Sequence, residues 1–391
     1  MAKMGLKASL TANVIVLGVT SLLTDVSSEM IFPLLPFFMV RVLGIPYLLV
    51  GLIEGAAEGS SSLVMTISGW LSDRMGMRKV YALIGYILST LSKPLFAFAN
   101  STPQILAIRI SDRLGKGVRT PPRDALLADS VDETLRGRAF GFHRSMDTTG
   151  AILGPLLALA LFPIIWYRGV FLTSLFPGVA SVVLLWALLK ERSVARTTPV
   201  SISFISSLKS FRREFKVFIF IQALFAIGNF SYAFFLLRST DLGVPQILAP
   251  MLYLVFNTFY AILALPMGAV MDRIGRRRVM LFGYGIFALT SAGFAWASSI
   301  PEAFILFAVY GLFRAAYETS YRALVPELVP PNLKATAYGV LNTVVGLMAL
   351  PGGIIAGALW QVYGGVAPFI LSLLVSIASV VIFLIFLGLR R

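Results

Sequence analysis

The sequence predicts an all-α membrane protein with twelve transmembrane helices, formed by two parallel repeats of six helices around a central cavity. Three observations point to this fold: the composition, the number of apolar segments and an internal repeat. Of the 391 residues, 58% are hydrophobic and only 13% are charged, and the mean hydropathy is +0.85. Soluble domains are about 45–50% apolar and about 25% charged, so a chain of soluble domains is excluded.

Twelve apolar segments follow one another, each with about the 20 residues that a membrane-spanning helix needs. The first is too long for a cleaved signal peptide. The connections are short except for residues 191–216, so we expect an N-terminal bundle over 1–190, a cytoplasmic linker over 191–216 and a C-terminal bundle over 217–391. The segments lie near residues 9–40, 47–72, 79–99, 103–127, 139–162, 168–190, 217–240, 247–270, 278–299, 302–325, 336–360 and 365–388.

The fourth segment, residues 103–127, is the least typical because it carries several charged side chains, each costly at the centre of an isolated membrane helix. The alternative is that a cytoplasmic loop begins near residue 115. We favour a helix, because losing this span would move every later loop to the opposite side of the membrane, against the distribution of basic residues.

Basic residues outnumber acidic ones by 33 to 18, which gives a net charge of +15. With the N-terminus inside, the external loops contain only Arg41, Arg168 and Arg238, while cytoplasmic loops hold most other basic residues. This asymmetry is typical of the positive-inside rule rather than of nucleic-acid binding. We therefore expect a monomeric multi-pass protein of the plasma (inner) membrane, embedded in the lipid bilayer, with both termini cytoplasmic.

Several chemistries are excluded by residue types that are missing or rare. The chain has no cysteine and one histidine, His143, which excludes Cys-ligated metals, thiol nucleophiles and a multi-histidine metal site within one chain. The sequence GKGVRT at 115–120 lacks the phosphate-binding pattern G-x-x-x-x-G-K-[ST]. We expect no cofactor, no ATP hydrolysis and no enzymatic activity.

The linker contains an amphipathic pattern at residues 201–216, SISFISSLKSFRREFK. Its apolar side chains fall on one helical face and its basic side chains on the other, which favours a helix lying in the headgroup layer. A plain flexible tether is the alternative.

An internal repeat is the most specific pattern in the chain. GWLSDRMGMRKV at 69–80 recurs as GAVMDRIGRRRV at 268–279, and a weaker echo pairs Asp129 with Glu327 and Gly141 with Gly339. Because both halves have six spans and the same orientation, the repeats are parallel, with an axis along the membrane normal. This is the architecture of transporters in which one bundle rocks against the other around a midplane site.

The repeated loop, G-x-x-x-D-R-x-G-x-R-K/R, resembles the loop signature of the major facilitator superfamily, and the resemblance covers nearly all of the chain. It implies the major facilitator fold and a loop network that latches the outward-open state. Arg74, Arg78 and Lys79 offer donors to acids at other helix ends, with Asp129 and Glu327 as the candidate partners. The alternative, which we favour for Arg78 and Lys79, is that these basic residues only set the topology. The expected latch residues are Gly69, Asp73, Arg74, Gly76, Asp129, Asp272, Arg273 and Glu327.

Two further elements resemble the same family. Gly150, Gly154 and Pro155 in the fifth span resemble the motif that proton-coupled exporters place at the interface between halves, although simple helix packing would also use small residues four apart. Arg109 and Gly115 in the fourth span resemble the family element whose arginine takes part in proton coupling. The resemblance also implies that the glycines of spans two and eleven form sliding surfaces.

Carboxylates inside the predicted spans are functional candidates by default. Asp25 and Glu29 lie four residues apart in span one, and Glu54 and Glu58 do so in span two, so each pair shares a helical face. Two neighbouring carboxylates seldom both ionise in a medium of low polarity, so one of them is suited to carry a proton. The alternative is static ion pairing with the bases Lys93, Arg109, Arg113 or Arg144. The predicted coupling and cavity residues are Asp25, Glu29, Glu54, Glu58, Arg109, Asp112, Arg113, Arg314 and Glu318.

These observations favour a secondary active transporter that exports small amphiphilic compounds in exchange for protons by alternating access. Aromatic residues of the second half would suit an amphiphilic substrate. The alternatives are divalent-metal efflux through the acids of spans one and two, organic-anion or lysolipid transport through buried cations, and an intramembrane enzyme or sensor, for which no catalytic constellation is present.

Overall fold

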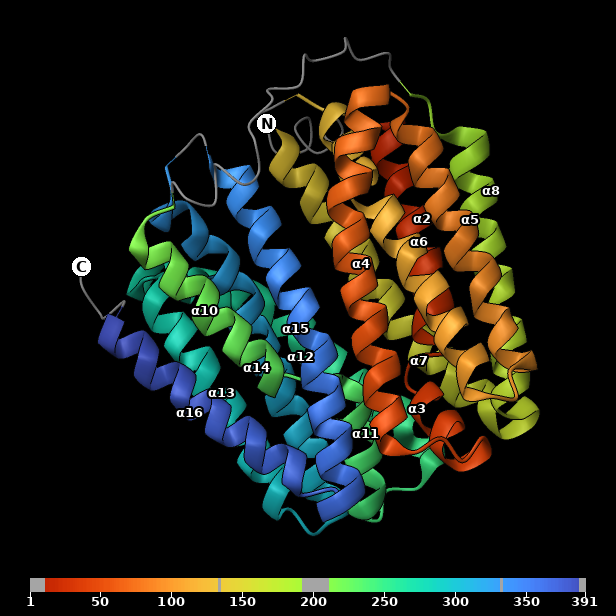
Figure 1. The fold of residues 1–391 in the computed structure, drawn as a ribbon. Coiled ribbons are helices and arrows are strands. Elements are labelled where there is room, and N and C mark those ends of the chain that lie inside the picture. Colours follow the sequence, from red (N-terminus) through yellow and green to blue (C-terminus); the bar gives the residue numbers. More distant parts are fainter. Residues whose placement is uncertain (1–10, 133–134, 192–210, 331–332, 387–391) are drawn as a thin grey trace. The chain divides into compact units, whose positions relative to one another are not determined.

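The computed structural model describes residues 11–132, 135–191, 211–330 and 333–386, and within these ranges the only regular secondary structure is helical. Figure 1 shows the helices in chain order. The first half contains α2 (Ala12–Glu29), α3 (Leu35–Phe37), η1 (Phe38–Val42), α4 (Tyr47–Met75), α5 (Arg78–Leu95), η2 (Phe96–Phe98), α6 (Thr102–Asp129), α7 (Arg136–Thr173) and α8 (Leu175–Leu188). The second half contains α10 (Arg213–Gly228), α11 (Tyr232–Asp241), η4 (Gln246–Leu248), α12 (Ala249–Ile274), α13 (Arg276–Trp296), α14 (Ile300–Leu328), α15 (Lys334–Tyr363) and α16 (Ala367–Phe386).

Twelve spans are present, as the sequence predicts. Nine segments of the described residues are long and apolar enough to cross a membrane. One of them, residues 136–188, contains 53 residues and breaks at Trp166, where φ is 55°, so it supplies two spans. The interrupted helix from Ala12 to Val42 and the charged helix α6 supply the remaining two. The loop alternative for residues beyond 115 is wrong, because α6 continues to Asp129.

The described residues group into two compact units. Unit 1 takes those within 1–39 and 60–199, and unit 2 takes those within 40–59 and 200–391. Helix α4 therefore contributes its first half to unit 2 and its second half to unit 1. The domain boundaries near residues 190 and 217 stay a prediction. Most of the predicted linker helix, residues 201–210, lies outside the described residues, and α10 begins at Arg213.

In unit 1, α2 packs against α7 and α8, while α5 packs against α6 and α8 (Figure 1). The contact between α5 and α6 is close because both helices bring glycine to it. A Cβ atom at Gly85 would lie 2.6 Å from the Gly115 carbonyl oxygen, and a Cβ at Gly115 would lie 2.7 Å from the Gly85 carbonyl oxygen. Larger side chains at these positions would force the helices apart.

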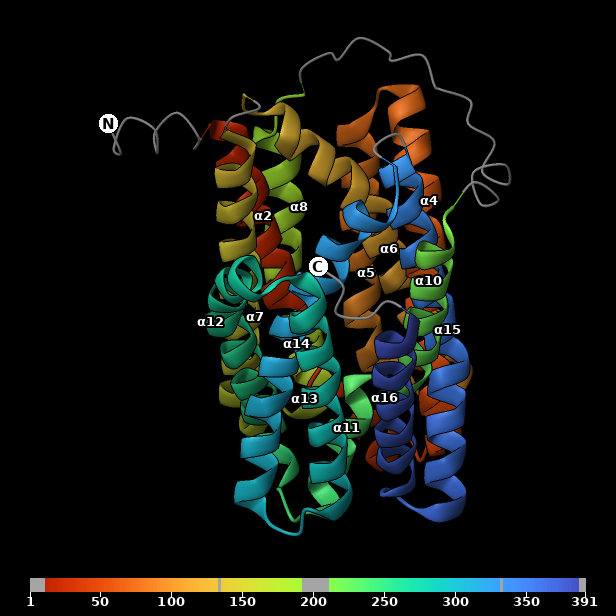
Figure 2. The same cartoon turned by 90° about the vertical axis from the view of Figure 1, so that its left-hand side faces the viewer.

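In unit 2, α12 packs against α14, α13 against α14 and α16, and α10 against α15 and α16. Figure 2 shows α10, α15 and α16 side by side. Aromatic rings fill the core, where Phe225 contacts Tyr284, Phe287 and Tyr317 at centroid distances of 4.6, 5.2 and 5.1 Å. The first half of α4 lies against α15: a Cβ at Gly55 would come within 2.6 Å of Ala349 backbone oxygen.

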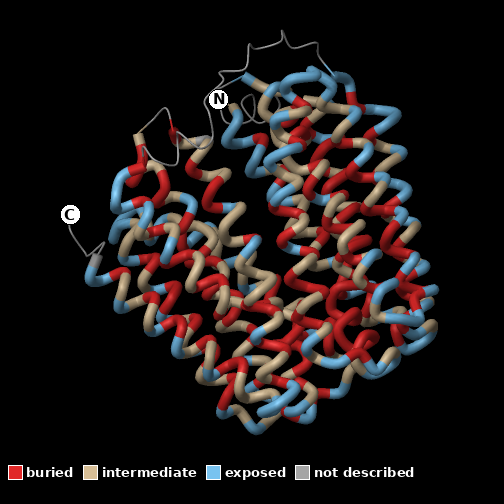
Figure 3. Tube along the Cα trace, in the orientation of Figure 1, coloured by how far each residue is buried: buried red, intermediate tan, exposed pale blue. Residues whose placement is uncertain are grey.

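The helix surfaces are apolar along their lengths. Exposed positions recur throughout the helices rather than only at their ends (Figure 3), and many of them carry large apolar side chains, including Phe176 at 74% exposure and Leu265 at 84%. Such surface is unfavourable in water and suits contact with lipid acyl chains.

The two halves also begin their fourth spans alike, because Gln104 accepts a hydrogen bond from the Asn100 N–H and Glu302 accepts one from the Ser298 N–H, each at 2.8 Å.

Candidate coupling site

The carboxylates Asp25 and Glu29 lie on the last turn of α2. The helix begins at the Thr11 cap, whose hydroxyl accepts from the Val14 N–H at 3.4 Å, and it ends at Glu29, shortly before Pro33. Proline lacks the N–H that a continuing helix requires. Both acidic residues are half-buried, and Oε2 of Glu29 is inaccessible to solvent. The break therefore places the two carboxylates at a helix end inside a membrane span.

Small residues of α7 pack against the face of α2 that carries Asp25 and Glu29. A Cβ at Gly150 would lie 2.8 Å from the Cβ of Asp25, and a Cβ at Gly154 would lie 2.6 Å from the Cβ of Glu29. The two glycines and the two acids share the same four-residue spacing, so α7 meets α2 along the backbone of its acidic face. These contacts lie within unit 1. The role of the motif between the halves stays a prediction.

The cations Arg109 and Arg113 of α6 share one aromatic ring. Their guanidinium carbons lie 4.5 and 4.9 Å from the centroid of Phe32, and their exposed fractions are 0% and 8%. An Nη1 atom of Arg109 lies 3.6 Å from Asp112, whose carboxylate accepts a hydrogen bond from Ser89 at 2.6 Å. Cation–π contacts strengthen when they are desolvated, so Phe32 supports both charges.

Lys93 of α5 completes this cluster. Its side chain is fully buried, and its Nζ donates to the Thr24 carbonyl at 3.4 Å and to the Ser27 hydroxyl at 3.2 Å. Lys93 also interacts electrostatically with Asp112, Asp25 and Glu29. An isolated ammonium would be expensive at this depth, so these carboxylates and polar groups are what allow it to stay charged. The sequence offered Lys93 only as a possible partner for static pairing.

The acids of α4 belong to a different part of the molecule. Glu54 is buried in unit 2 and accepts a hydrogen bond from the Ser231 hydroxyl at 3.1 Å, whereas Glu58 is exposed. Ser231 caps α11 at the point where span seven is interrupted between Gly228 and Tyr232, and its hydroxyl also accepts from the Ala233 N–H at 3.3 Å. A carboxylate beside a helix N-terminus is favoured by the helix dipole.

The predicted pair of span ten is formed. Arg314 lies 2.7 Å from Glu318, and Glu318 is also 3.6 Å from Arg322 one turn further on. These residues therefore form a local network along α14 in unit 2. The described residues contain no group of three or more His, Asp or Glu side chains that could hold a metal ion.

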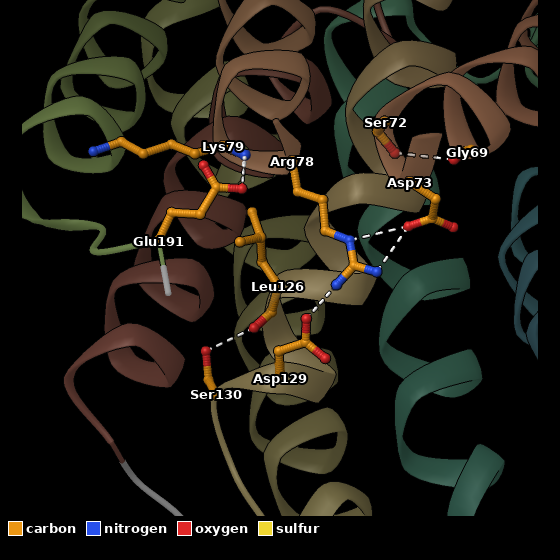
Figure 4. A network of polar contacts seen from close by, with 9 residues as sticks. All are labelled: Gly69, Ser72, Asp73, Arg78, Lys79, Leu126, Asp129, Ser130 and Glu191. Atoms are coloured by element: carbon orange, nitrogen blue, oxygen red, sulfur yellow. Dashed lines mark hydrogen bonds and ion pairs between the residues drawn. The ribbon is translucent and has the colours of Figure 1, made fainter. Parts of the chain in front are cut away.

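The predicted latch of unit 1 is centred on Arg78 (Figure 4). Its Nε and Nη2 donate to Asp73 at 3.0 and 2.8 Å, and its Nη1 donates to Asp129. The neighbouring Lys79 donates through Nζ to the carbonyls of Trp186 and Leu189 at 3.0 and 2.6 Å, at the end of α8. The sequence offered Asp129 as a candidate partner for the basic residues of this loop but favoured a topological role for Arg78, whereas in the structure Arg78 pairs with both Asp73 and Asp129.

The remaining latch residues have varied surroundings. Arg74 lies 5.2 Å over the Trp70 ring, Gly69 packs against Pro121, and Gly76 has φ of +65°, which a residue with a side chain rarely adopts. In unit 2, Asp272 and Arg273 are exposed, and Glu327 pairs with Arg276 at 2.9 Å. Arg276 was not among the predicted residues, because it lies one position before the residue that matches Arg78.

Comparison with known proteins gives consistent results along the whole chain. The family model described as "Major Facilitator Superfamily" matches residues 17–256 and 217–391. An uncharacterised MFS-type transporter of Methanocaldococcus jannaschii is 36% identical over 380 residues, which cover 93% of this chain and 94% of that protein. Among solved structures, a variant of the nucleoside transporter NupG has a TM-score of 0.81 at 15% identity and covers 97% of this chain and 100% of its own, which indicates the same fold.

Two relatives match over shorter stretches. The tetracenomycin C resistance and export protein of Streptomyces glaucescens is 33% identical over 120 residues, or 31% of this chain and 22% of that protein. The quinolone resistance protein NorA of Staphylococcus aureus is 27% identical over 126 residues, or 32% of each chain.

Proposed function

Because this chain belongs to the Major Facilitator Superfamily, we propose that it is a secondary active transporter that exports small amphiphilic compounds in exchange for protons. The chain is a multi-pass membrane transporter and not an enzyme. The proton coupling, the direction and the substrate class are the proposed part.

One observation carries the coupling proposal: half-buried acids sit beside fully buried cations. Asp25 and Glu29 are held by the α7 glycines, and Lys93 interacts with both acids from inside the bundle. When a carboxylate of this group releases its proton, Lys93 compensates the new negative charge. A proton can therefore bind and leave without creating an isolated charge in a medium of low polarity.

Asp25 is the proposed proton carrier. The residue is half-buried, and its electrostatic neighbours include Asp147 as well as Arg119 and Lys116. A substrate that binds near Asp25 would favour release of the proton, and return of the proton would favour release of the substrate. This exchange is the requirement for antiport by alternating access.

Export is the proposed direction. The support is the resemblance of Gly150, Gly154 and Pro155 to an exporter motif, together with two relatives whose names refer to resistance or export. Each of these relatives matches about a third of this chain. The aromatic core of unit 2 is consistent with an amphiphilic substrate.

The experiment that tests the proposal measures proton release from purified protein when a compound is added at fixed pH. Ethidium represents amphiphilic cations, a lysophospholipid represents lipids, and benzoate represents organic anions. We expect the wild-type protein to release protons with an amphiphilic compound and Asp25→Asn to bind the same compound without release. Glu214→Gln, an exposed acid at the start of α10, is the matched control and should behave as wild type.

A second candidate is transport of organic anions, which the buried Lys93, Arg109 and Arg113 favour by their charge. In that case benzoate would bind, and Arg113→Gln would abolish its binding without any proton release in the wild-type protein. Proton release that persists in Asp25→Asn would remove Asp25 as the carrier.

A further inference from the structure

Unit 1 contains a second polar cluster, nearer the end of the bundle where α5 and α7 begin and α6 ends. We call this the loop end, and under the proposed orientation it faces the cytoplasm. The cluster draws on four helices: Thr20 and Ser21 of α2, Tyr86 of α5, Arg119 and Arg123 of α6, and His143 and Asp147 of α7. None of these residues was among the predicted site residues.

Several polar atoms of this cluster are buried and find no hydrogen-bond partner among the described residues. They are the Thr20 hydroxyl, Nε and Nη1 of Arg119, and Nε2 of His143. The exposed fractions of these three residues are 0%, 6% and 4%. Buried polar atoms are almost always satisfied, and where protein groups do not satisfy them, bound water does.

The members of the cluster are connected to one another. The Arg119 guanidinium lies 4.8 Å over the Tyr86 ring. Asp147 accepts a hydrogen bond from the Ser21 hydroxyl and lies 3.6 Å from Nδ1 of His143. Tyr86 makes a side-chain hydrogen bond with Arg123 and interacts electrostatically with Arg119 and Asp147. The unsatisfied atoms of Arg119 and His143 therefore belong to one connected group of polar side chains.

An apolar layer separates this region from the loop end. Val14 and Leu17 precede Thr20 on α2, Leu126 and Leu127 follow Arg123 on α6, and Ala139 precedes His143 on α7. These side chains pack together with the ring of Tyr86 in one buried apolar cluster. Water in the polar region would therefore be enclosed on that side.

The charges decide what occupies the region. The buried Arg119 and the partly buried Arg123 are accompanied by the carboxylates Asp25, Asp124 and Asp147. Lys116 and Arg144 are exposed, so solvent screens their charges. The cluster therefore has no excess of positive charge, which favours a neutral occupant over an inorganic anion, and the atoms that lack partners include both donors and acceptors, as water requires.

Asp147 lies between this region and the proposed proton carrier. It is one turn before Gly150, which contacts Asp25, and its hydrogen-bond donor Ser21 is one turn before Asp25. Among the charged neighbours of Asp25, Asp147 has the largest electrostatic effect on it. The side chain of Asp147 is 15% exposed. A proton leaving Asp25 therefore has an acceptor nearby that also reaches the polar region.

We propose that this cluster encloses bound water and that Asp147 is a second proton-carrying residue, which exchanges protons with Asp25 through that water. In the step, the Asp25 carboxyl gives its proton to a water molecule, and the water gives another proton to the Asp147 carboxylate. Asp25 becomes a carboxylate, Asp147 becomes a carboxylic acid, and the water is regenerated. The relay rests on the proposed proton coupling, whereas the bound water does not.

The bound water is tested by radiolytic hydroxyl-radical labelling of the purified full chain, because radicals formed from bound water modify the side chains beside it. We expect Tyr86 and His143 to be modified although they are buried, and Phe171 and Phe313, which are fully buried among rings, to stay unmodified. If Tyr86 and His143 were labelled no faster than Phe171, the proposal of bound water beside them would be wrong.

The relay is tested by the rate of substrate-driven proton release with ethidium as the probe. We expect Asp147→Asn to slow release about a hundredfold and Tyr86→Phe to slow it about tenfold, with unchanged ethidium binding and an unchanged number of protons released. The matched control is Tyr284→Phe on α13 of unit 2, because its buried hydroxyl finds no partner among the described residues and lies in an aromatic core. Circular dichroism and thermal unfolding check that each variant is folded.

The outcomes separate the two proposals. If the wild-type protein releases no proton with any compound, the proposed function fails. The labelling experiment still tests whether the cluster encloses bound water. If the wild-type protein releases protons and Asp147→Asn does so at the same rate, the relay fails while the proposed function stands. Equal slowing by Tyr86→Phe and Tyr284→Phe would also contradict the relay.

Discussion

Gly154 of α7 lies directly against Glu29 of α2, so closely that a Cβ atom at Gly154 would approach the Glu29 Cβ to 2.6 Å. Gly150 meets Asp25 in the same way one turn earlier. The two helices thus touch backbone to backbone along the acidic face, and the acids have no room to turn toward α7. Because Gly150 and Gly154 have no side chains, α7 can approach the backbone of α2 closely beside Asp25 and Glu29.

We predict that Gly154→Ala separates α2 from α7. The added methyl group would clash with the Glu29 backbone and side chain, and overpacking of this kind costs about 1–3 kcal/mol. Thermal unfolding of the purified protein measures the loss. The control is Gly141→Ala on the same helix, where a Cβ would meet nothing within 4 Å, so that replacement of glycine in a helix should be neutral or stabilising by up to about 1 kcal/mol. Equal stability of the two variants would contradict the close contact.

The second prediction concerns the buried ammonium of Lys93. Lys93→Met should destabilise the protein by about 3–5 kcal/mol, because it leaves the carboxylates near Lys93 without their compensating charge. Adding Asp112→Asn should recover part of the loss, since Lys93 and Asp112 interact electrostatically. A double-mutant cycle from denaturation midpoints measures the interaction energy. Strictly additive effects of the two substitutions would show that the charges do not interact.

The third prediction separates stability from conformational control at Arg78. Its side chain is 19% exposed and its partners Asp73 and Asp129 are 55% and 35% exposed, so Arg78→Gln should change stability by about 1 kcal/mol or less. If the network latches one state of the transport cycle, the transport rate of Arg78→Gln should fall below the wild-type rate by a much larger factor than this stability change implies. Arg138→Gln, which removes an exposed charge at the start of α7 but no ion pair of this network, is the control, and equal transport rates in the two variants would argue against a latch.

The fourth prediction concerns the interruption of span seven. Ser231 both caps α11 and donates to the buried Glu54. Ser231→Ala should lower stability by about 1–3 kcal/mol, because it removes a helix cap and leaves a buried carboxylate short of a donor. Ser231→Thr keeps the hydroxyl and should retain most of the stability. Thermal unfolding distinguishes the two, and an Ala variant as stable as the Thr variant would show that the hydroxyl contributes little.

The helices and the repeat could be predicted because their signals are local. Apolar segments, the loop motif at 69–80 and its echo at 268–279 can be recognised without knowing which faces meet. Helix α6 was the informative case: its charges argue against a membrane span, yet topology required one, and the structure accommodates Arg109 and Arg113 by burying them over Phe32.

The partners of the charged residues could not be predicted in the same way. Ser231 is far from Glu54 in sequence, and only the packing of whole helices brings them together. The repeat pointed to Asp129 as a partner of the loop, but the sequence did not show that Arg78 would be the residue that binds it. Breaks at Pro33 and near Asn229 were also missed, because both lie inside segments whose apolar content reads as continuous. The same limit applies to Asp147, whose importance depends on the contact between Gly150 and Asp25.

The last prediction concerns orientation in the membrane. The natural chain has no cysteine, so a single introduced cysteine reports only its own position. Asp132→Cys, between α6 and α7, and Ser298→Cys, between α13 and α14, are both exposed and lie in loops that we assign to opposite sides of the membrane. In intact cells a membrane-impermeant maleimide should label Ser298→Cys, and it should label Asp132→Cys only after permeabilisation. The reason is the concentration of basic residues on one side, which retains those loops in the cytoplasm. The reverse pattern would invert the protein and place the polar cluster of Tyr86 and His143 toward the outside, so that the proposed proton relay would open to the opposite compartment.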